Sequence, residues 1–171
     1  MQWLVLMFAL ATGGVLSVLG SLFGQVLAGT GAGLVALAVT GPLYEEIMKA
    51  LVVLMLIELR PYVFRNAWAI WAATLGSAAT FATLENLLYL NVYIPDPSTG
   101  IILWRWTACS ALHVGCTAIA TVGLVRMWRN SITHLRPPAV SDAYPFLVAA
   151  IIVHGAYNAA VVLAEFAGLS F

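Results

Sequence analysis

The segment Leu34–Ile57, which reads LVALAVTGPLYEEIMKALVVLMLI, decides the fold of this chain. It is long enough to cross a bilayer, which takes about 20 apolar residues in a helix, yet Glu45, Glu46 and Lys49 lie near its middle. Each charge at that depth costs about 2.5–3.5 kcal/mol on insertion scales. Ionisable residues inside a membrane span are functional by default, so the segment predicts a membrane helix that carries part of a functional site.

The three charges of this segment can pair with one another. Lys49 follows Glu45 by four residues and Glu46 by three, so either carboxylate can share a helix face with the ammonium. One ammonium does not satisfy two carboxylates, and the other needs a further partner or a bound proton. Gly41-Pro42, just before, loosens the helix because proline removes a backbone donor. The alternative is an ion-pair cluster that only pins helices together.

The composition of the whole chain indicates a membrane protein. Its 171 residues are 63% hydrophobic and 8% charged, with seven basic and seven acidic side chains. Soluble domains carry about 25% charged residues. This composition excludes an ordinary soluble domain, a disordered chain and a nucleic-acid binder that needs a basic surface. The lipid bilayer is therefore the expected partner.

Five apolar stretches predict an all-α, polytopic membrane helix bundle that forms one domain over residues 1–171. The predicted spans are Trp3–Leu27, Leu34–Ile57, Ala67–Leu90, Ile101–Val125 and Tyr144–Gly168. The first span lacks the basic start of a signal peptide, and the glycine-rich connection Gly29–Gly33 follows it. Its small residues predict a helix that packs closely on its neighbours, and they are Gly13, Ser17, Gly20, Ser21 and Gly24.

Basic residues predict the orientation. Five arginines lie in or beside the second and fourth connections: Arg60, Arg65, Arg126, Arg129 and Arg136. The first and third connections have no basic residue except Arg105, just inside the fourth span. We therefore expect a cytoplasmic N-terminus and an outer C-terminus. The expected location is a prokaryotic cytoplasmic membrane.

Four further polar side chains lie inside the other spans. Glu85 lies near the end of the third, His113 near the middle of the fourth, and His154 and Asn158 one turn apart in the fifth. At 1.5 Å per residue from the outer end of each span, Glu45, His113, His154 and Asn158 lie at about 15–21 Å, and Glu85 at about 8–12 Å. Four helices therefore bring these groups to one layer, which indicates an active site or an ion site.

Cys109 and Cys116 lie seven residues apart on the fourth span, about 10.5 Å along a helix axis, which is too far for a disulfide between them. With His113 they form a Cys-His-Cys stripe, but a straight helix does not aim all three side chains at one ion. We interpret both cysteines as small packing residues.

The polar residues occur as Glu45-Glu46-x-x-Lys49, Phe81-x-x-x-Glu85-Asn86 followed by Leu-Leu-Tyr, then His113, then His154-x-x-x-Asn158. In order and spacing they resemble the PrsW family of intramembrane proteases, over about Gly41 to Val162. That family is classed with metalloproteases and is distantly related to CAAX prenyl proteases and bacteriocin-processing enzymes. The resemblance implies hydrolysis of peptide bonds in membrane-spanning or membrane-proximal protein substrates, and it indicates no oligomeric state.

The CAAX enzymes have Glu-Glu-x-x-x-Arg and a histidine where Glu85 stands. Their carboxylate-activated water is therefore carried over to Glu45 rather than to Glu85. The predicted catalytic residues are Glu45, Glu46, Lys49, Glu85, His113, His154 and Asn158.

On the preferred mechanism no cofactor is required. Glu45 is the general base for water, and Glu46 and Lys49 set its charge state. His154 and Asn158 donate to the oxyanion. His113 and Glu85 position the water or protonate the leaving amine.

Two alternatives stay open. In a zinc-dependent version, two histidines and a glutamate hold Zn²⁺ and another glutamate is the base, although the His-Glu-x-x-His motif is absent. The candidate ligands are Glu46, Glu85, His113 and His154. The second alternative is a proton- or cation-coupled carrier, or a membrane protein that binds partners without cutting them. Five spans do not divide into the two repeats typical of carriers.

Overall fold

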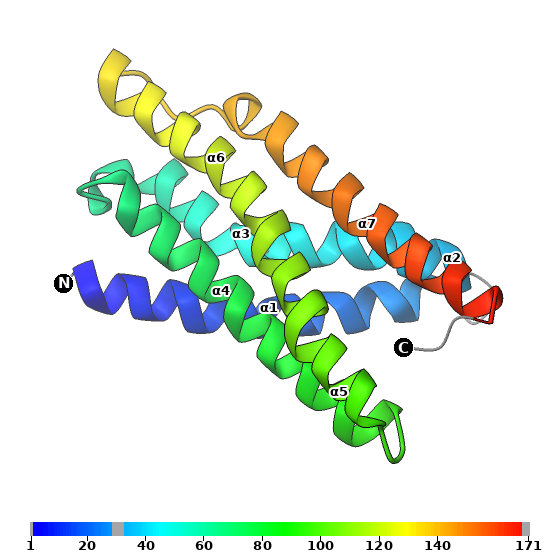
Figure 1. Ribbon diagram of the computed structural model, residues 1–171. Coiled ribbons are helices and arrows are strands. Elements are labelled where there is room, and N and C mark those ends of the chain that lie inside the picture. The colour runs from blue at the N-terminus through cyan, green and yellow to red at the C-terminus, as the bar shows by residue number, and fades with distance from the viewer. Residues whose placement is uncertain (1, 29–32, 169–171) are drawn as a thin grey trace.

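Residues 2–28 and 33–168 are described in the computed structural model of this chain, and within them every regular element is helical. The long helices of the bundle (Figure 1) are α1 (Gln2–Ala28), α3 (Gly41–Leu59), α4 (Ala67–Leu88), α6 (Ser110–His134) and α7 (Tyr144–Phe166). Residues 29–32 of the predicted glycine-rich connection lie outside the described part. The predicted all-α membrane helix bundle is confirmed for the part described.

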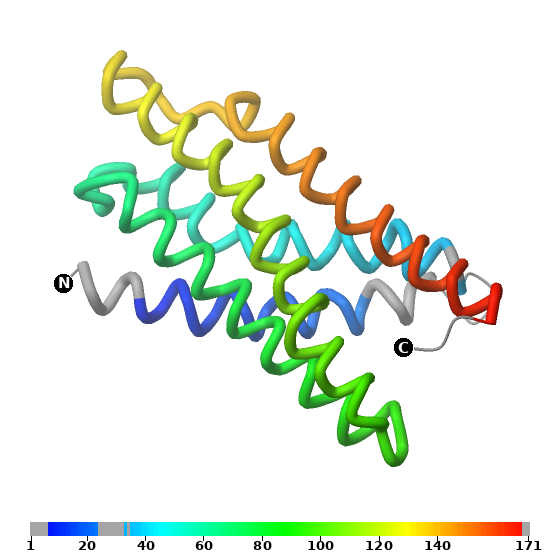
Figure 2. The backbone as a smooth tube through the Cα atoms, in the orientation of Figure 1, coloured from blue at the N-terminus to red at the C-terminus, as the bar shows by residue number. Residues whose placement is uncertain are grey.

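Short helical pieces extend several of these helices into longer rods (Figure 2). The pieces are α2 (Gly33–Val35) and the π-helix η1 (Ala36–Thr40) before α3, the π-helix η3 (Tyr89–Tyr93) after α4, and α5 (Thr99–Trp104) with the π-helix η4 (Arg105–Cys109) before α6. The 3₁₀ turns η2 (Pro61–Val63) and η5 (Val140–Asp142) lie in connections. The rods correspond to the predicted spans.

The largest difference from the predicted boundaries is at the end of α6. The helix runs to His134, whereas the predicted span ends at Val125. Charge is costly in lipid, which ends a span at the arginines, but a helix can continue past the membrane into water. Leu135, with a left-handed φ of 50°, and then Pro137 end the helix.

Among the described residues, three rods are long and apolar enough to cross a membrane: Ala67–Tyr93, Thr99–His134 and Tyr144–Phe166. Met7–Phe23 in α1 is a shorter apolar helix. α3 differs from these because it carries four charges, Glu45, Glu46, Lys49 and Glu58. All but Glu58 are buried inside the bundle, so the neighbouring helices shield these three charges from lipid.

Gly41-Pro42 loosens the second rod, as the sequence predicts. Pro42 has no N–H to donate, and in the π-helical turn before it the Gly41 N–H bonds the Ala36 carbonyl. α7 passes so close to this turn that a Cβ on Gly155 would collide with the Ala38 carbonyl oxygen. Because residue 155 has no side chain, α7 can pack closely against η1, the turn that leads into α3.

α1 packs against α3 and α4, α4 against α6, and α6 against α7. A Cβ on Gly13 would collide with Ser77 of α4, and one on Gly20 would lie 2.8 Å from Met48 Cγ of α3. The predicted close packing of the first span is confirmed for these two glycines. The packing of Gly24 lies outside the described residues.

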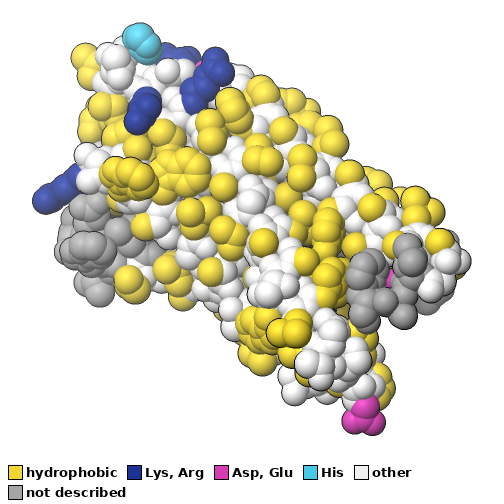
Figure 3. All heavy atoms as spheres, in the orientation of Figure 1, with side chains coloured by type: hydrophobic (Ala, Val, Ile, Leu, Met, Phe, Trp, Pro, Cys, Tyr) yellow, Lys and Arg dark blue, Asp and Glu magenta, His cyan; other side chains and the backbone are white. Residues whose placement is uncertain are grey.

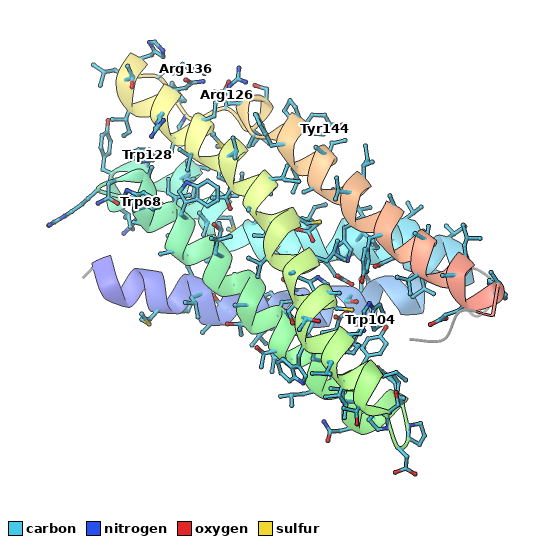
Figure 4. The ribbon with its side chains drawn as sticks, viewed as in Figure 1. Trp68, Trp104, Arg126, Trp128, Arg136 and Tyr144 are labelled. Atoms are coloured by element: carbon cyan, nitrogen blue, oxygen red, sulfur yellow. The ribbon has the colours of Figure 1, made fainter. Side chains whose placement is uncertain are left out.

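The two ends of the bundle differ in charge. The start of α1, residues 60–66 and residues 135–143 lie toward one end (Figure 1), where arginine side chains gather on the visible face (Figure 3). Arg126 and Arg136 lie at this end in Figure 4, and Trp104 lies in the opposite half. Arg105 is instead buried in the bundle, so it is no loop charge. The positive-inside asymmetry becomes clearer, and the cytoplasmic N-terminus stays a prediction.

Candidate active site

Glu46 is held on every side. Its Oε1 accepts a hydrogen bond from Lys49 Nζ at 2.5 Å and lies 2.8 Å from His154 Nδ1. Its Oε2 accepts from Thr117 Oγ1 at 3.2 Å. The sequence left open which carboxylate pairs with Lys49, and the structure assigns the pair to Glu46, three residues earlier on the same helix.

Glu45 is also buried, but one of its oxygens is free, since adjacent helix residues point about 100° apart and meet different neighbours. Its Oε1 accepts from Ser21 Oγ of α1 at 3.0 Å. Its Oε2 has no hydrogen-bond partner among the described residues, and it lies 3.9 Å from His113 Nδ1 and 3.6 Å from His154 Nε2. A buried carboxylate oxygen without a partner is costly, which indicates a ligand at this point.

Each histidine has an inner ring nitrogen, which faces Glu45, and an outer ring nitrogen, which lies within hydrogen-bond distance of another carboxylate. His113 Nε2 lies 2.9 Å from Glu85 Oε2, and His154 Nδ1 lies 2.8 Å from Glu46 Oε1. An ionised carboxylate only accepts, so both outer nitrogens carry the hydrogen. In a neutral ring the inner nitrogen then has a lone pair. The lone pairs of the two inner nitrogens therefore converge with Glu45 Oε2. One of these lone pairs, on His113 Nδ1, accepts a hydrogen bond from Lys49 Nζ at 3.3 Å.

Glu85 has a cation of its own. Arg105 Nη2 donates to Glu85 Oε2 at 2.8 Å, and the same oxygen bonds His113. The side chain of Glu85 is 16% exposed, whereas that of Glu46 is 0% exposed. Glu85 therefore occupies the outer edge of the cluster and Glu46 its interior.

Phe81 packs against the cluster. Its ring centroid lies 4.7 Å from Lys49 Nζ, and its ring meets that of His113 edge to face at 4.9 Å. The rings of His113 and His154 also meet edge to face at 4.9 Å. Phe81 is completely buried, so it shields the lysine and the imidazole from lipid and water.

A cavity of about 210 Å³ adjoins the cluster. Its polar walls include Glu85, Arg105, His113, His154 and Asn158. Asn158 lies one turn beyond His154, and its Nδ2 donates to the Leu37 carbonyl at 3.0 Å. One of its two amide hydrogens is therefore used to hold η1, and the other is available to a molecule in the cavity.

The structure brings the residues that the sequence selected to one place. Glu45, Glu46, Lys49, Glu85, His113 and His154 form one contact cluster, and Asn158 lies in the wall of the adjoining cavity. Their catalytic roles stay predictions. Ser21 and Arg105 also belong to the site, and the sequence did not select them. Ser21 had the pattern of a packing residue, and Arg105 had the position of a span-end charge.

One group among the described residues has the geometry of a metal site. Glu45, His113 and His154 each offer a ligand atom, and these atoms lie within 4.8 Å of one another. Imidazole and carboxylate are usual zinc ligands, and metal-bound histidines usually donate their other N–H to a carboxylate or carbonyl. Both histidines do so here. The donor set and the unpartnered Glu45 Oε2 therefore fit a metal ion.

The predicted ligand candidates overlap with this group in His113 and His154. The other two candidates, Glu46 and Glu85, instead bond the outer nitrogens of the histidines and pair with Lys49 and Arg105. Cys109 and Cys116 are buried and free. Neither belongs to the metal group of the described residues, in agreement with the interpretation that they are packing residues.

The fold and the site define a class of protein: a polytopic membrane helix bundle with a buried cluster of carboxylates and histidines beside a cavity. The chain matches the PrsW family intramembrane metalloproteases over residues 1–171 and belongs to that family. Neither the curated proteins nor the solved structures give a match. Family membership supports intramembrane proteolysis as the general activity.

Proposed function

We propose that this protein is an intramembrane endopeptidase, with the whole chain as one protease domain, that cuts membrane-spanning or membrane-proximal protein substrates. Glu45 Oε2 carries the proposal, because it is a buried carboxylate oxygen without a hydrogen-bond partner between two imidazoles. Membership of the family supports the class of reaction. The cavity beside the cluster supports access by a peptide.

The hydrogen bonds of the histidines favour the metal-dependent version of this reaction. A neutral His154 that donates from Nδ1 to Glu46 has no hydrogen on Nε2, so it is not a donor to an oxyanion. Two imidazole lone pairs and a carboxylate oxygen that face one point suit a cation. Held by Glu45, His113 and His154, a zinc ion would supply a Lewis acid for the peptide carbonyl and activate water.

The other residues act around this point. Glu46 and Glu85 fix the ring orientation of His154 and His113, and Lys49 offsets the charge of Glu46. Glu85 lines the cavity, and in this proposal it takes a proton from the attacking water and returns it to the leaving amine. Asn158 offers its second amide hydrogen to the oxyanion.

A metal-free version is the second candidate. In that version Glu45 Oε2 is the general base for water, and His154 must be doubly protonated to donate to the oxyanion. Lys49 is the observation that favours it. Its Nζ lies 3.3 Å from His113 Nδ1 and places a positive charge beside the point where a metal ion would be bound.

The test of the activity is reconstitution in liposomes with a panel of single-span substrates. Wild type is compared with Glu45→Ala, Glu46→Ala and His154→Ala, and Glu58→Gln is the matched control because Glu58 is exposed at the end of the same helix. We expect cleavage by wild type and by the control only. Cleavage that persists in the three site variants would remove the proposed site, and proton or cation flux without cleavage would favour a carrier.

Metal analysis of the purified protein separates the two versions. Stoichiometric zinc, together with activity that a chelator abolishes and zinc restores, is the result expected of the metal-dependent version. Full activity in protein shown to be free of metal would leave the Glu45 base as the mechanism.

A further inference from the structure

Arg105 is a buried charge to which the proposed mechanism gives no part. Its side chain is 8% exposed, and it lies at the first residue of η4, within an apolar rod. A buried arginine is costly unless it is well paired. Its partners therefore indicate what it does.

The guanidinium is divided between two adjacent residues of α4. Nη2 donates to Glu85 Oε2 at 2.8 Å, and Nε donates to Asn86 Oδ1 at 3.1 Å. The group also stacks over the Tyr89 ring, 3.8 Å from its centroid. Asn86 Nδ2 donates back to the Arg105 carbonyl at 3.1 Å. A planar guanidinium held by this many contacts has a fixed orientation. The Glu85 carboxylate that it hydrogen-bonds is therefore fixed in orientation as well.

The π-helical turn of η4 sets Arg105 and His113 on one face. In a regular α-helix, residues eight positions apart point about 80° apart. A π-turn holds one extra residue, so the separation behaves as seven positions, which return to within about 20°. The Ser110 N–H bonds the Arg105 carbonyl across this wide turn. Both side chains consequently reach the same atom, Glu85 Oε2.

We infer that Arg105 is a positioning residue: with Asn86 it fixes the Glu85 carboxylate so that Oε2 accepts from His113 Nε2, which leaves the lone pair on His113 Nδ1, beside Lys49 Nζ and Glu45. Its catalytic consequence rests on the proposed peptidase function, and its structural consequence does not. If Arg105 only offset the charge of Glu85, a lysine at this position would serve equally well. If Arg105 orients the carboxylate, the planar guanidinium with its several donors is required.

The structural consequence is tested by ¹⁵N NMR of histidine-labelled protein in nanodiscs, which reports which ring nitrogen of His113 carries the hydrogen. Wild type is expected to show one tautomer, with the hydrogen on Nε2. Arg105→Gln is expected to give a mixture, and Arg105→Lys, which keeps the charge, to restore the single tautomer only in part. Arg126→Gln, an exposed arginine at the far end of α6, is the control and is expected to match wild type.

The catalytic consequence is tested on the same variants with a cleaved single-span substrate. Arg105→Gln is expected to lower kcat about 10–100-fold, as removal of an outer hydrogen-bond partner does in metal sites, with KM changed less. In a Glu85→Gln background the same substitution is expected to add no further loss, since Arg105 acts through Glu85.

Three results would overturn the inference: an unchanged His113 tautomer in Arg105→Gln, full restoration of tautomer and kcat by Arg105→Lys, or an undiminished loss in the Glu85→Gln background. If Arg105→Gln does not fold, an unchanged tautomer in Arg105→Lys decides against it. Failure of wild type to cut any substrate would remove the proposed function, while the tautomer measurement would still test the positioning role.

Discussion

Two chains of contacts, each a cation, a carboxylate and an imidazole, meet at Glu45 Oε2. In the inner chain, Lys49, Glu46 and His154 are at most 1% exposed. In the outer chain, the side chains of Arg105 and Glu85 are 8% and 16% exposed and line the cavity with His113. The inner chain is therefore fully buried and reaches the cavity only through His154, whereas all three residues of the outer chain line it. On the proposed function, the inner chain holds the site together and the outer chain faces the substrate.

The largest effect is expected from removal of the atom where both chains meet. Glu45→Gln keeps the size of the side chain and replaces its carboxylate with an amide, so neither a metal ion nor a water proton is bound as before. We expect cleavage of a single-span substrate to fall about 10²–10⁴-fold. Activity within about twofold of wild type would mean that the two chains do not converge on the reacting atoms.

The next effect compares the two chains directly. Glu46→Gln leaves the Lys49 ammonium buried without a carboxylate, and loss of one partner of a buried pair costs about 3–5 kcal/mol. Glu85→Gln is expected to destabilise the fold less, because Arg105 borders the cavity and water can solvate it there. Unfolding titrations in detergent would measure both. Equal losses of stability would break the distinction between a core chain and a cavity chain.

A smaller effect, on stability, is expected at Gly155 of α7, next to His154 of the inner chain. A Cβ on Gly155 would collide with the Ala38 carbonyl, so Gly155→Ala should push α7 away from η1 and cost about 1–3 kcal/mol, as overpacking does. Gly115→Ala on α6 is the matched control, since a Cβ there meets nothing within 4 Å and alanine favours the helix. If Gly155→Ala is as stable as this control, the close approach does not hold His154 in place.

Much of this arrangement could be predicted from the sequence because depth in a membrane helix follows from counting residues. The 1.5 Å rise per residue placed Glu45, His113 and His154 in one layer, and the structure brings them together. Helical spacing also predicted that Lys49 can reach either carboxylate. It did not decide between them, because that choice depends on the direction in which α3 turns these side chains relative to α6 and α7.

Arg105 shows what counting residues misses. On a regular helix it would not share the His113 face, and the π-turn that brings the two together has no sequence pattern comparable to Gly-Pro. A signal was still present, since an arginine inside an apolar span needs an intramembrane partner and Glu85 lay near the same depth. Ser21 carried no such signal, because a small residue on a packing helix serves equally well without a hydrogen bond.

The smallest effect concerns Ser21, the residue of α1 that hydrogen-bonds Glu45. Ser21 Oγ donates to Glu45 Oε1 at 3.0 Å, which fixes the carboxylate so that Oε2 faces both histidines. A hydrogen bond to a charged group is worth about 1.5–3 kcal/mol. The other contacts of α1 keep the helix in place and so offset part of the loss of this hydrogen bond. We expect Ser21→Ala to lower cleavage about tenfold.

Ser17→Ala is the matched control for Ser21→Ala. Ser17 is buried one turn earlier on α1, but its hydroxyl bonds the Gly13 carbonyl of its own helix at 2.7 Å. Its loss should therefore leave cleavage near the wild-type rate. If both variants lose the same activity, α1 contributes only packing and the site consists of the two chains and Glu45 alone. If Ser21→Ala alone loses activity, the first helix orients the carboxylate on which both chains converge.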